Sequence, residues 1–114
     1  MNQTLRSPID LEQLNQISEG DIEFEMEVLQ IYVEDVQQRL EGIRLAITGG
    51  DKLQVMKEAH HIKGSSSNVG AIQMRDLAVK LEALNLAQDS IKAMEIFEKM
   101  AFNIQLVANF VAER

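Results

Sequence analysis

The central segment of the chain reads Ala59-His60-His61-Ile62-Lys63-Gly64-Ser65-Ser66-Ser67 and contains both of its histidines. Val55, Ala59 and Ile62 are apolar and are spaced by four and three residues, which predicts a helix that runs into this segment. Inside a helix a glycine costs about 1 kcal/mol relative to alanine, and a serine roughly a few tenths. A helix that served only packing would seldom collect Gly64 and three serines in a row. We therefore expect this part of the helix to need small side chains for another purpose.

The two histidines point in different directions if the segment is helical. The stripe expected to face the core consists of Val55, Ala59, Ile62 and Ser66. His60 points roughly 140° from the centre of that stripe, so its ring is expected to reach solvent. Lys63 and Gly64, one turn further on, lie within about 60° of His60, whereas His61 lies about 100° away. His60, Lys63 and Gly64 therefore share one surface patch, and His61 lies outside it.

The residues on either side of this segment also favour helices, because the alternation typical of strands is missing. We expect a short helix over about 10–16, a long one over 22–47, a third from Asp51 to a turn near 68–70, a fourth over 71–84 and a last over 91–111. Short connections between the long helices favour antiparallel neighbours. The predicted fold class is all-α, an antiparallel up-down-up-down four-helix bundle with a short additional N-terminal helix across one end. Residues 9–114 are expected to form this single domain, and residues 1–8 a flexible N-terminus.

Capping residues and apolar stripes define the expected helices further. Asp10, Asp21 and Asp51 are each placed to cap the helix that follows, and Gln13 resembles the reciprocal partner of Asp10 in a capping box. The acidic stretches at 23–27 and 34–35 are interpreted as solvated faces. The apolar stripe of the last helix begins at Ile91. In the long second helix the stripe expected to be buried consists of Phe24, Val28, Ile31, Tyr32, Val36, Leu40, Ile43 and Ile47.

Composition excludes several classes of protein. The 114 residues include 18 acidic and 11 basic side chains, for a net charge of −7 and a pI near 4.7. Such a surface repels phosphate backbones, so no nucleic-acid binding is expected. Cysteine is absent, which excludes disulfides and thiolate metal sites. No apolar run approaches the about 20 residues of a membrane span, and the N-terminus lacks a signal segment, so we expect no membrane association and a cytoplasmic location.

The patch around His60 suits the transfer of a phosphoryl group. An imidazole is largely neutral at pH 7, and a neutral ring nitrogen can attack phosphorus. Lys63 places a cation beside the phosphoryl oxygens, and Gly64 removes the side chain that would block a partner's approach. An exposed histidine with no task is the plainer interpretation of His60 alone. The adjacent histidines are not a metal site, because neighbouring helical residues diverge too far to chelate one ion.

The segment from Ala59 to Ser66, followed by Asn68-Val69-Gly70-Ala71, resembles the signature of histidine-containing phosphotransfer (HPt) domains. The resemblance covers about residues 9–112. Ile62 and Met74 stand where leucine is more usual, and both remain apolar. The resemblance implies a four-helix bundle that relays phosphate between aspartates of response-regulator receiver domains in a two-component phosphorelay. On this pattern His60 is the phosphoacceptor, Lys63 stabilises the phosphoryl group, Gly64 gives steric access and His61 falls at a variable position.

The third and fourth helices should form a hairpin, and residues at similar distances from its turn lie side by side. Glu82 then lies near His60, where it either accepts a hydrogen bond from one ring nitrogen and fixes the tautomer or remains a solvated surface acid. Asn85 is a weaker candidate for the same position. Ser67 lies within about 60° of His60 and is a candidate for binding the partner or a phosphoryl oxygen. Met56 is a candidate for an apolar docking patch, with packing at the edge of the core as the alternative.

The expected partners are receiver domains, with a hybrid histidine kinase as a further candidate. A phosphate-binding loop requires Gly-Lys-Ser/Thr after a strand, whereas here Lys63 precedes Gly64 and no strand is predicted. The chain is therefore interpreted as a phosphoryl carrier without its own ATP site, not an enzyme. It is expected to be a free-standing monomer, with a module of a larger hybrid sensor kinase as the alternative. It is expected to bind no cofactor or metal, with Mg²⁺ supplied on the receiver domain. The alternative is a non-catalytic acidic four-helix-bundle adaptor that binds a signalling partner.

Overall fold

The structure is a computed structural model that describes residues 7–113. Most of the segment expected to be flexible, residues 1–8, lies outside the described residues. The helices and their bounds are α1 (Leu11–Ser18), α2 (Ile22–Gly49), α3 (Lys52–Val69), α4 (Ile72–Ala83) and α5 (Ser90–Glu113). No strand occurs between residues 7 and 113. The predicted all-α class is confirmed.

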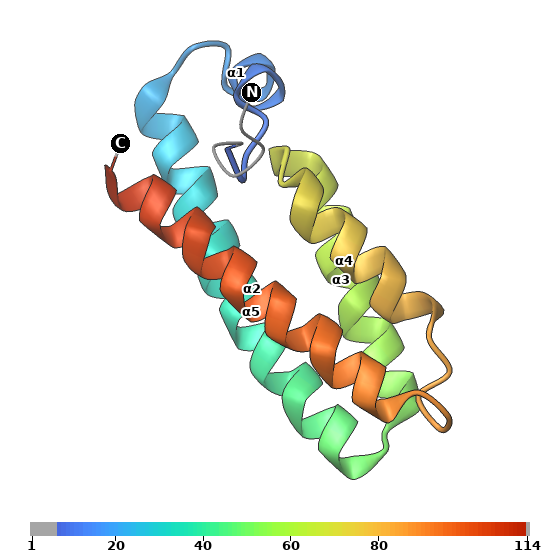
Figure 1. Ribbon diagram of the computed structural model, residues 1–114. Helices are drawn as coiled ribbons and strands as arrows, with labels where there is room; N and C mark the ends of the chain where they lie inside the picture. Colours follow the sequence, from blue (N-terminus) through green and yellow to red (C-terminus); the bar gives the residue numbers. More distant parts are fainter. Residues whose placement is uncertain (1–6, 114) are drawn as a thin grey trace, which may run out of the picture.

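The four long helices form one bundle in which consecutive helices run antiparallel (Figure 1). Helix α3 packs against α2 and α4, and α5 packs against α4 and α2 to close the bundle. The backbones of α3 and α5 are not adjacent, so these two helices lie at diagonally opposite corners of the bundle. Helix α1 lies across the end of the bundle at which α5 finishes (Figure 1). This arrangement confirms the up-down-up-down topology and the position expected for the short helix.

The helix starts are capped as the sequence predicts. The Asp10 carboxylate accepts hydrogen bonds from the Glu12 and Gln13 amides, and Asp21 and Asp51 accept from the amides three residues on. Gln13 was predicted to complete a capping box with Asp10, and this prediction is wrong. Its side-chain amide instead donates to the Ser67 carbonyl at the end of α3, because α1 packs against that helix end.

A backbone hydrogen bond fixes the start of α1 to the turn between α3 and α4. The Asp10 amide donates to the Gly70 carbonyl at 2.7 Å. Gly70 has φ +80°, and a Cβ there would stand 3.0 Å from the Asp10 carbonyl oxygen. A glycine is therefore required both for the left-handed backbone and for the approach of α1. This contact stabilises the hairpin of α3 and α4, which carries the candidate site.

The core contains the stripe predicted for α3, since Val55, Ala59, Ile62 and Ser66 are all buried. Three apolar residues expected in the core are exposed instead. Phe24 is 44% exposed, Ile31 68% and Ile91 77%. Phe24 and Ile31 lie well over 100° around α2 from Val36, at the centre of its buried face. Their apolar character alone therefore does not place them in the core.

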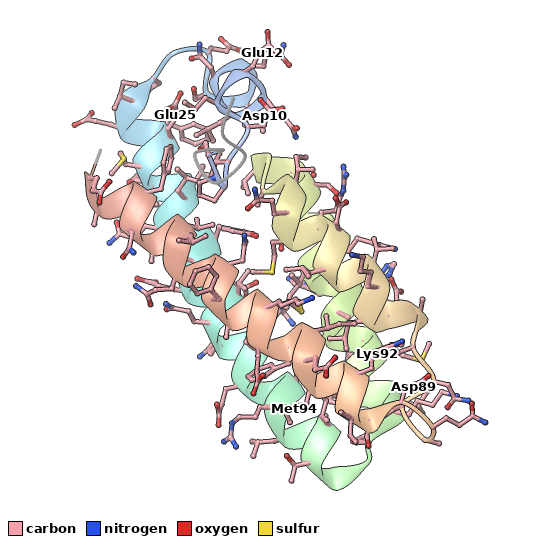
Figure 2. All side chains as sticks on the ribbon, viewed as in Figure 1. Asp10, Glu12, Glu25, Asp89, Lys92 and Met94 are labelled. Carbon is pink, nitrogen blue, oxygen red and sulfur yellow. The ribbon has the colours of Figure 1, made fainter. Side chains whose placement is uncertain are left out.

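One acidic residue of α2 is buried, against expectation. Glu25 is only 2% exposed and lies near the end of the bundle marked by Asp10 and Glu12 (Figure 2). Its carboxylate accepts a hydrogen bond of 2.6 Å from the Ser18 hydroxyl at the end of α1. The solvated face predicted for residues 23–27 is therefore interrupted, because α1 covers this position. The opposite end of the bundle carries Asp89 and Lys92 (Figure 2).

Candidate functional site

His60 projects outward from the middle of α3, as its position on the helix predicts. Its side chain is 67% exposed, although the helix it stands on is anchored by fully buried Ala59 and Ile62. The ring is therefore accessible to another protein while its backbone is held by the bundle. Lys63 follows one turn later, with its side chain 34% exposed.

Glu82 of α4 contacts both His60 and Lys63. Its Oε2 lies 2.9 Å from His60 Nδ1, and its Oε1 lies 3.1 Å from Lys63 Nζ. Of the two alternatives for Glu82, the hydrogen bond to the His60 ring is the one that is present. The hydrogen bond from Lys63, joined by that from His60, holds the pKa of the Glu82 carboxyl below its usual value. The group is thus ionised at neutral pH.

The ionised Glu82 determines how the His60 ring is protonated. A carboxylate can only accept hydrogen bonds, so Nδ1 must carry the proton that it shares with Glu82. In the neutral ring the lone pair is then on Nε2. Nε2 makes no hydrogen bond or ion pair among the described residues. The nitrogen that can act as a nucleophile is therefore the one that remains accessible to another protein.

Gly64 is exposed, and the fold does not require it. A Cβ built there meets no atom within 4 Å, and the residue lies in the interior of α3 with ordinary helical backbone. At about 100° per residue, Gly64 lies about 40° from His60 on the side towards α2. The surface beside the His60 ring is consequently open on that side.

His61 points away from His60 towards α2, in agreement with the predicted angle of about 100° between them. Its Nε2 lies 3.4 Å from the Asp35 carboxylate of α2. Asp35 also binds Arg39, whose guanidinium reaches across to Glu58 of α3 at 2.7 Å. His61 therefore belongs to a polar network between α2 and α3, separate from the His60, Lys63 and Glu82 cluster.

Three further residues were candidates for the site: Met56, Ser67 and Asn85. Met56 is half-buried on α3. The Ser67 hydroxyl donates to the Lys63 carbonyl at 3.0 Å, and the Ser67 carbonyl receives the Gln13 side chain. Asn85 does not contact His60, because its side chain accepts a hydrogen bond from the Ala87 amide in the loop after α4. Of Glu82 and Asn85, which were both candidates for a hydrogen bond to His60, only Glu82 makes it.

A family model described as the Hpt domain matches residues 27–110 of the chain. This chain belongs to the Hpt domain family. The matched range runs from α2 to α5 and includes His60, Lys63, Gly64 and Glu82. The predicted recognition of the family is therefore confirmed.

Individual relatives agree with this assignment. The phosphorelay intermediate protein rdeA of Dictyostelium discoideum is 27% identical over 84% of this chain, which spans only 38% of that protein's length. The crystal structure of histidine-containing phosphotransfer protein B from Pseudomonas aeruginosa is similar with a TM-score of 0.81 and 25% identity, covering 92% of this chain and 91% of that one. The HPT domain of a Shewanella sensor hybrid histidine kinase, at 12% identity, TM-score 0.76 and coverage of 95% and 97%, shares the fold. The names of two of these relatives connect them with phosphorelays and with histidine phosphotransfer.

One buried feature of this Hpt domain was missed from the sequence. The Tyr32 hydroxyl of α2 and the Ser66 hydroxyl of α3 form a hydrogen bond of 2.6 Å inside the core. Burial raises the pKa of the Tyr32 phenol well above its usual value. Ser66 was expected only to face the core, and its partner was not predicted because Tyr32 lies 34 residues away in the sequence. The bond ties α3 to α2 two turns beyond His60.

The described residues contain no group of three or more histidine, cysteine or acidic side chains that could hold a metal ion. None of the helices in residues 7–113 is long and apolar enough to cross a membrane. The acid nearest to His60, Glu82, already binds two basic side chains.

The lowered pKa of Glu82 makes stability depend on pH. Since this pKa is lower in the folded state, ionised Glu82 stabilises the fold above the unfolded-state pKa, and the contribution is lost as pH falls through the folded-state pKa. We expect Glu82→Gln to lower the free energy of unfolding by under about 1 kcal/mol at pH 7. The difference from wild type should shrink as the pH falls from about 5 to about 3. Urea denaturation across this range measures it, and a difference that grows on acidification would contradict the assignment.

Proposed function

We propose that this Hpt domain carries a phosphoryl group on Nε2 of His60 between the aspartates of two receiver domains. The observation that carries the proposal is the Glu82 hydrogen bond to Nδ1, which leaves the exposed Nε2 as the nucleophile. The aspartyl phosphate of the first receiver is the donor. The Nε2 lone pair forms the new P–N bond while the P–O bond to the aspartate breaks and returns a carboxylate. The reverse reaction delivers the group to a second receiver.

Glu82 and Lys63 have complementary roles in this proposal. When Nε2 bonds to phosphorus while Nδ1 keeps its proton, the ring becomes a cation. The Glu82 carboxylate, 2.9 Å from Nδ1, stabilises that charge as well as the tautomer. Lys63 lies beside the ring and offers its ammonium group to the phosphoryl oxygens. Gly64 keeps the approach to Nε2 open.

The chain is proposed to act as a carrier that does not phosphorylate itself. We place no nucleotide site on it, because Lys63 and Gly64 stand in a helix and in the wrong order for a phosphate-binding loop. Divalent metal is needed to neutralise charge during phosphoryl transfer. We propose that the receiver supplies its ligands as well as the Mg²⁺, since Glu82 is already engaged by His60 and Lys63.

We further propose that receivers dock on the side of His60 that faces α2. Glu82 and Lys63 occupy the other side, whereas Gly64 opens towards α2. A shallow hollow of about 270 Å³ lies between α2 and α3 and is bordered by Ile31, which is 68% exposed. Apolar Val28, Ile31 and Val69 line part of this hollow, and we propose that an apolar side chain of the receiver occupies it. Met56 and Ser67 would then lie at the edge of the contact.

Substitution of Ile31 tests this docking side. We expect Ile31→Glu to lower the rate of phosphoryl transfer from a receiver at sub-saturating concentration by about tenfold, because one apolar contact at an interface is replaced by a charge. Ile91→Glu is the matched control, since Ile91 is equally exposed but lies on α5. Equal rates for the two variants would place the docking surface elsewhere.

The function itself is tested by incubating the protein with a labelled phospho-receiver and Mg²⁺. We expect the label to appear on this chain in an acid-labile, base-stable linkage, as a phosphoramidate requires. A second, unlabelled receiver should then remove it. If a broad panel of phospho-receivers binds the folded chain without transferring label, the chain is the acidic adaptor instead.

A further inference from the structure

Lys57 is a second lysine beside His60, one turn before it on α3, and it is exposed. At about 100° per residue it lies about 60° from His60, on the side of the ring that faces α2. Lys63 lies at a similar angle on the other side, where it binds Glu82 of α4 at 3.1 Å. Each lysine is about 4.5 Å from His60 along the helix axis, since each residue adds about 1.5 Å. His60 is therefore flanked by one lysine on each side.

The two lysines differ in their pairing. Lys57 makes no ion pair within residues 7–113. The positions three and four residues away on α3, from which an acid could pair with it, hold Leu53, Gln54, His60 and His61. Asp35 and Glu58, at the contact of α2 with α3, already bind Arg39. Lys57 is thus an unpaired cation on the side from which we propose that receivers approach.

The geometry of the helix brings Lys57 within reach of a group bound to the His60 ring. Side chains on a helix lean towards its N-terminus, so the His60 ring lies over the turn that contains Lys57. The ammonium group of a lysine stands on a flexible stem of four carbons. Nε2 is the ring nitrogen that Glu82 leaves unbound. A phosphoryl group on Nε2 is therefore accessible to Lys57 as well as to Lys63.

The charges of the phosphorylated site call for a second cation. A phosphoryl group on a side chain carries roughly 1.5 to 2 negative charges at pH 7. The His60 ring, with its proton on Nδ1, and Lys63 supply two positive charges, one of which is offset by ionised Glu82. About one negative charge is then left on the phosphoryl group. The Mg²⁺ of the receiver is not available to balance it once the receiver has left, whereas Lys57 is.

We propose that Lys57 is a second phosphoryl-binding residue, which contacts the phosphoryl oxygens on the α2 side of His60 while the group is carried. The inference rests on the proposed function and adds a residue to its site. Lys63 would contact the same group from the α4 side. The charge-assisted hydrogen bonds of the two lysines would then hold the group between them.

The equilibrium of transfer between a receiver and the chain tests this role. Labelled phospho-receiver and the full chain are mixed with Mg²⁺, both dilute enough to be mostly unbound, and the label on each is measured before hydrolysis removes it. We expect Lys57→Gln to lower the equilibrium constant for transfer to the chain by about tenfold, because a hydrogen bond to a charged group is lost. A residue that only helped docking would change the forward and reverse rates alike and leave this constant unchanged.

Lys99→Gln is the matched control, because Lys99 is also exposed and outside any ion pair of the described residues but lies on α5, diagonally opposite α3. Lysine and glutamine are similar helix formers, so both variants should fold. Lys57→Arg keeps the charge and should stay close to wild type. An unchanged constant in Lys57→Gln, or an equal change in Lys99→Gln, would overturn the inference while label on the chain still supports the proposed function. Absence of label from the wild type would instead overturn the proposed function itself.

Discussion

His60→Gln is expected to abolish acceptance of the phosphoryl group, whereas His61→Gln should accept it at nearly the wild-type rate. Glutamine has no ring nitrogen with a lone pair of the required basicity, so no P–N bond can form at position 60. The His61 ring instead points about 100° away from His60 and lies 3.4 Å from Asp35 of α2. Its loss removes a half-exposed contact that contributes at most about 1 kcal/mol to stability. Both variants should remain folded, because neither ring is buried.

The measurement is the amount of label on each variant after incubation with the same phospho-receiver. Circular dichroism of both variants controls for folding. Phosphorus NMR of the labelled wild type should then assign the group to Nε2, the nitrogen not bound to Glu82. Label that disappears only in His61→Gln would mean that the wrong histidine has been assigned. Phosphate on Nδ1 would mean that Glu82 does not fix the tautomer.

The position of Glu82 beside His60 could be predicted from the sequence. Once the turn at Gly70 is recognised, an antiparallel hairpin fixes which residues of α3 and α4 lie side by side. The contact then follows from counting residues away from the turn, and its two atoms lie 2.9 Å apart in the structure. The direction of His60 follows in the same way from helical periodicity. Both predictions depend only on local geometry, which the sequence specifies well.

Predictions that depend on the other helices were less successful. Ile31 and Phe24 are apolar and spaced as a core stripe would be, yet the position of α3 and α5 decides which face of α2 is buried. Glu25 is buried because α1 folds over it and Ser18 donates to it. Whether these side chains are buried depends on which helices pack against α2. Those helices are formed by residues distant from them in the sequence. The roles predicted for Lys63 and Gly64 came from their positions one turn after His60, and the family resemblance implies the same roles.

Substitution of Gly64 by a larger residue is expected to stabilise the fold and to slow phosphoryl transfer. Gly64→Ala is expected to raise the free energy of unfolding by about 1 kcal/mol, since it removes the cost of glycine inside a helix. The added methyl group meets no atom of the chain within 4 Å. Gly64→Leu should also be more stable than wild type, because leucine is a good helix former. We nevertheless expect Gly64→Leu to slow transfer by about 100-fold, because displacing reacting groups by about 1 Å can have such an effect.

Gly42→Ala provides the matched control for this prediction. Gly42 also lies inside a helix, and a Cβ there meets only the Glu58 carboxylate at an ordinary 3.6 Å. It should therefore gain stability to a similar extent while transfer is unchanged. Urea denaturation and transfer rates of the variants measure the two effects separately. A variant that is more stable but transfers slowly cannot have lost activity through unfolding. The presence of a destabilising glycine at position 64 would then be explained by the access that it gives the receiver to His60. Wild-type rates in Gly64→Leu would instead leave the glycine without a role in docking.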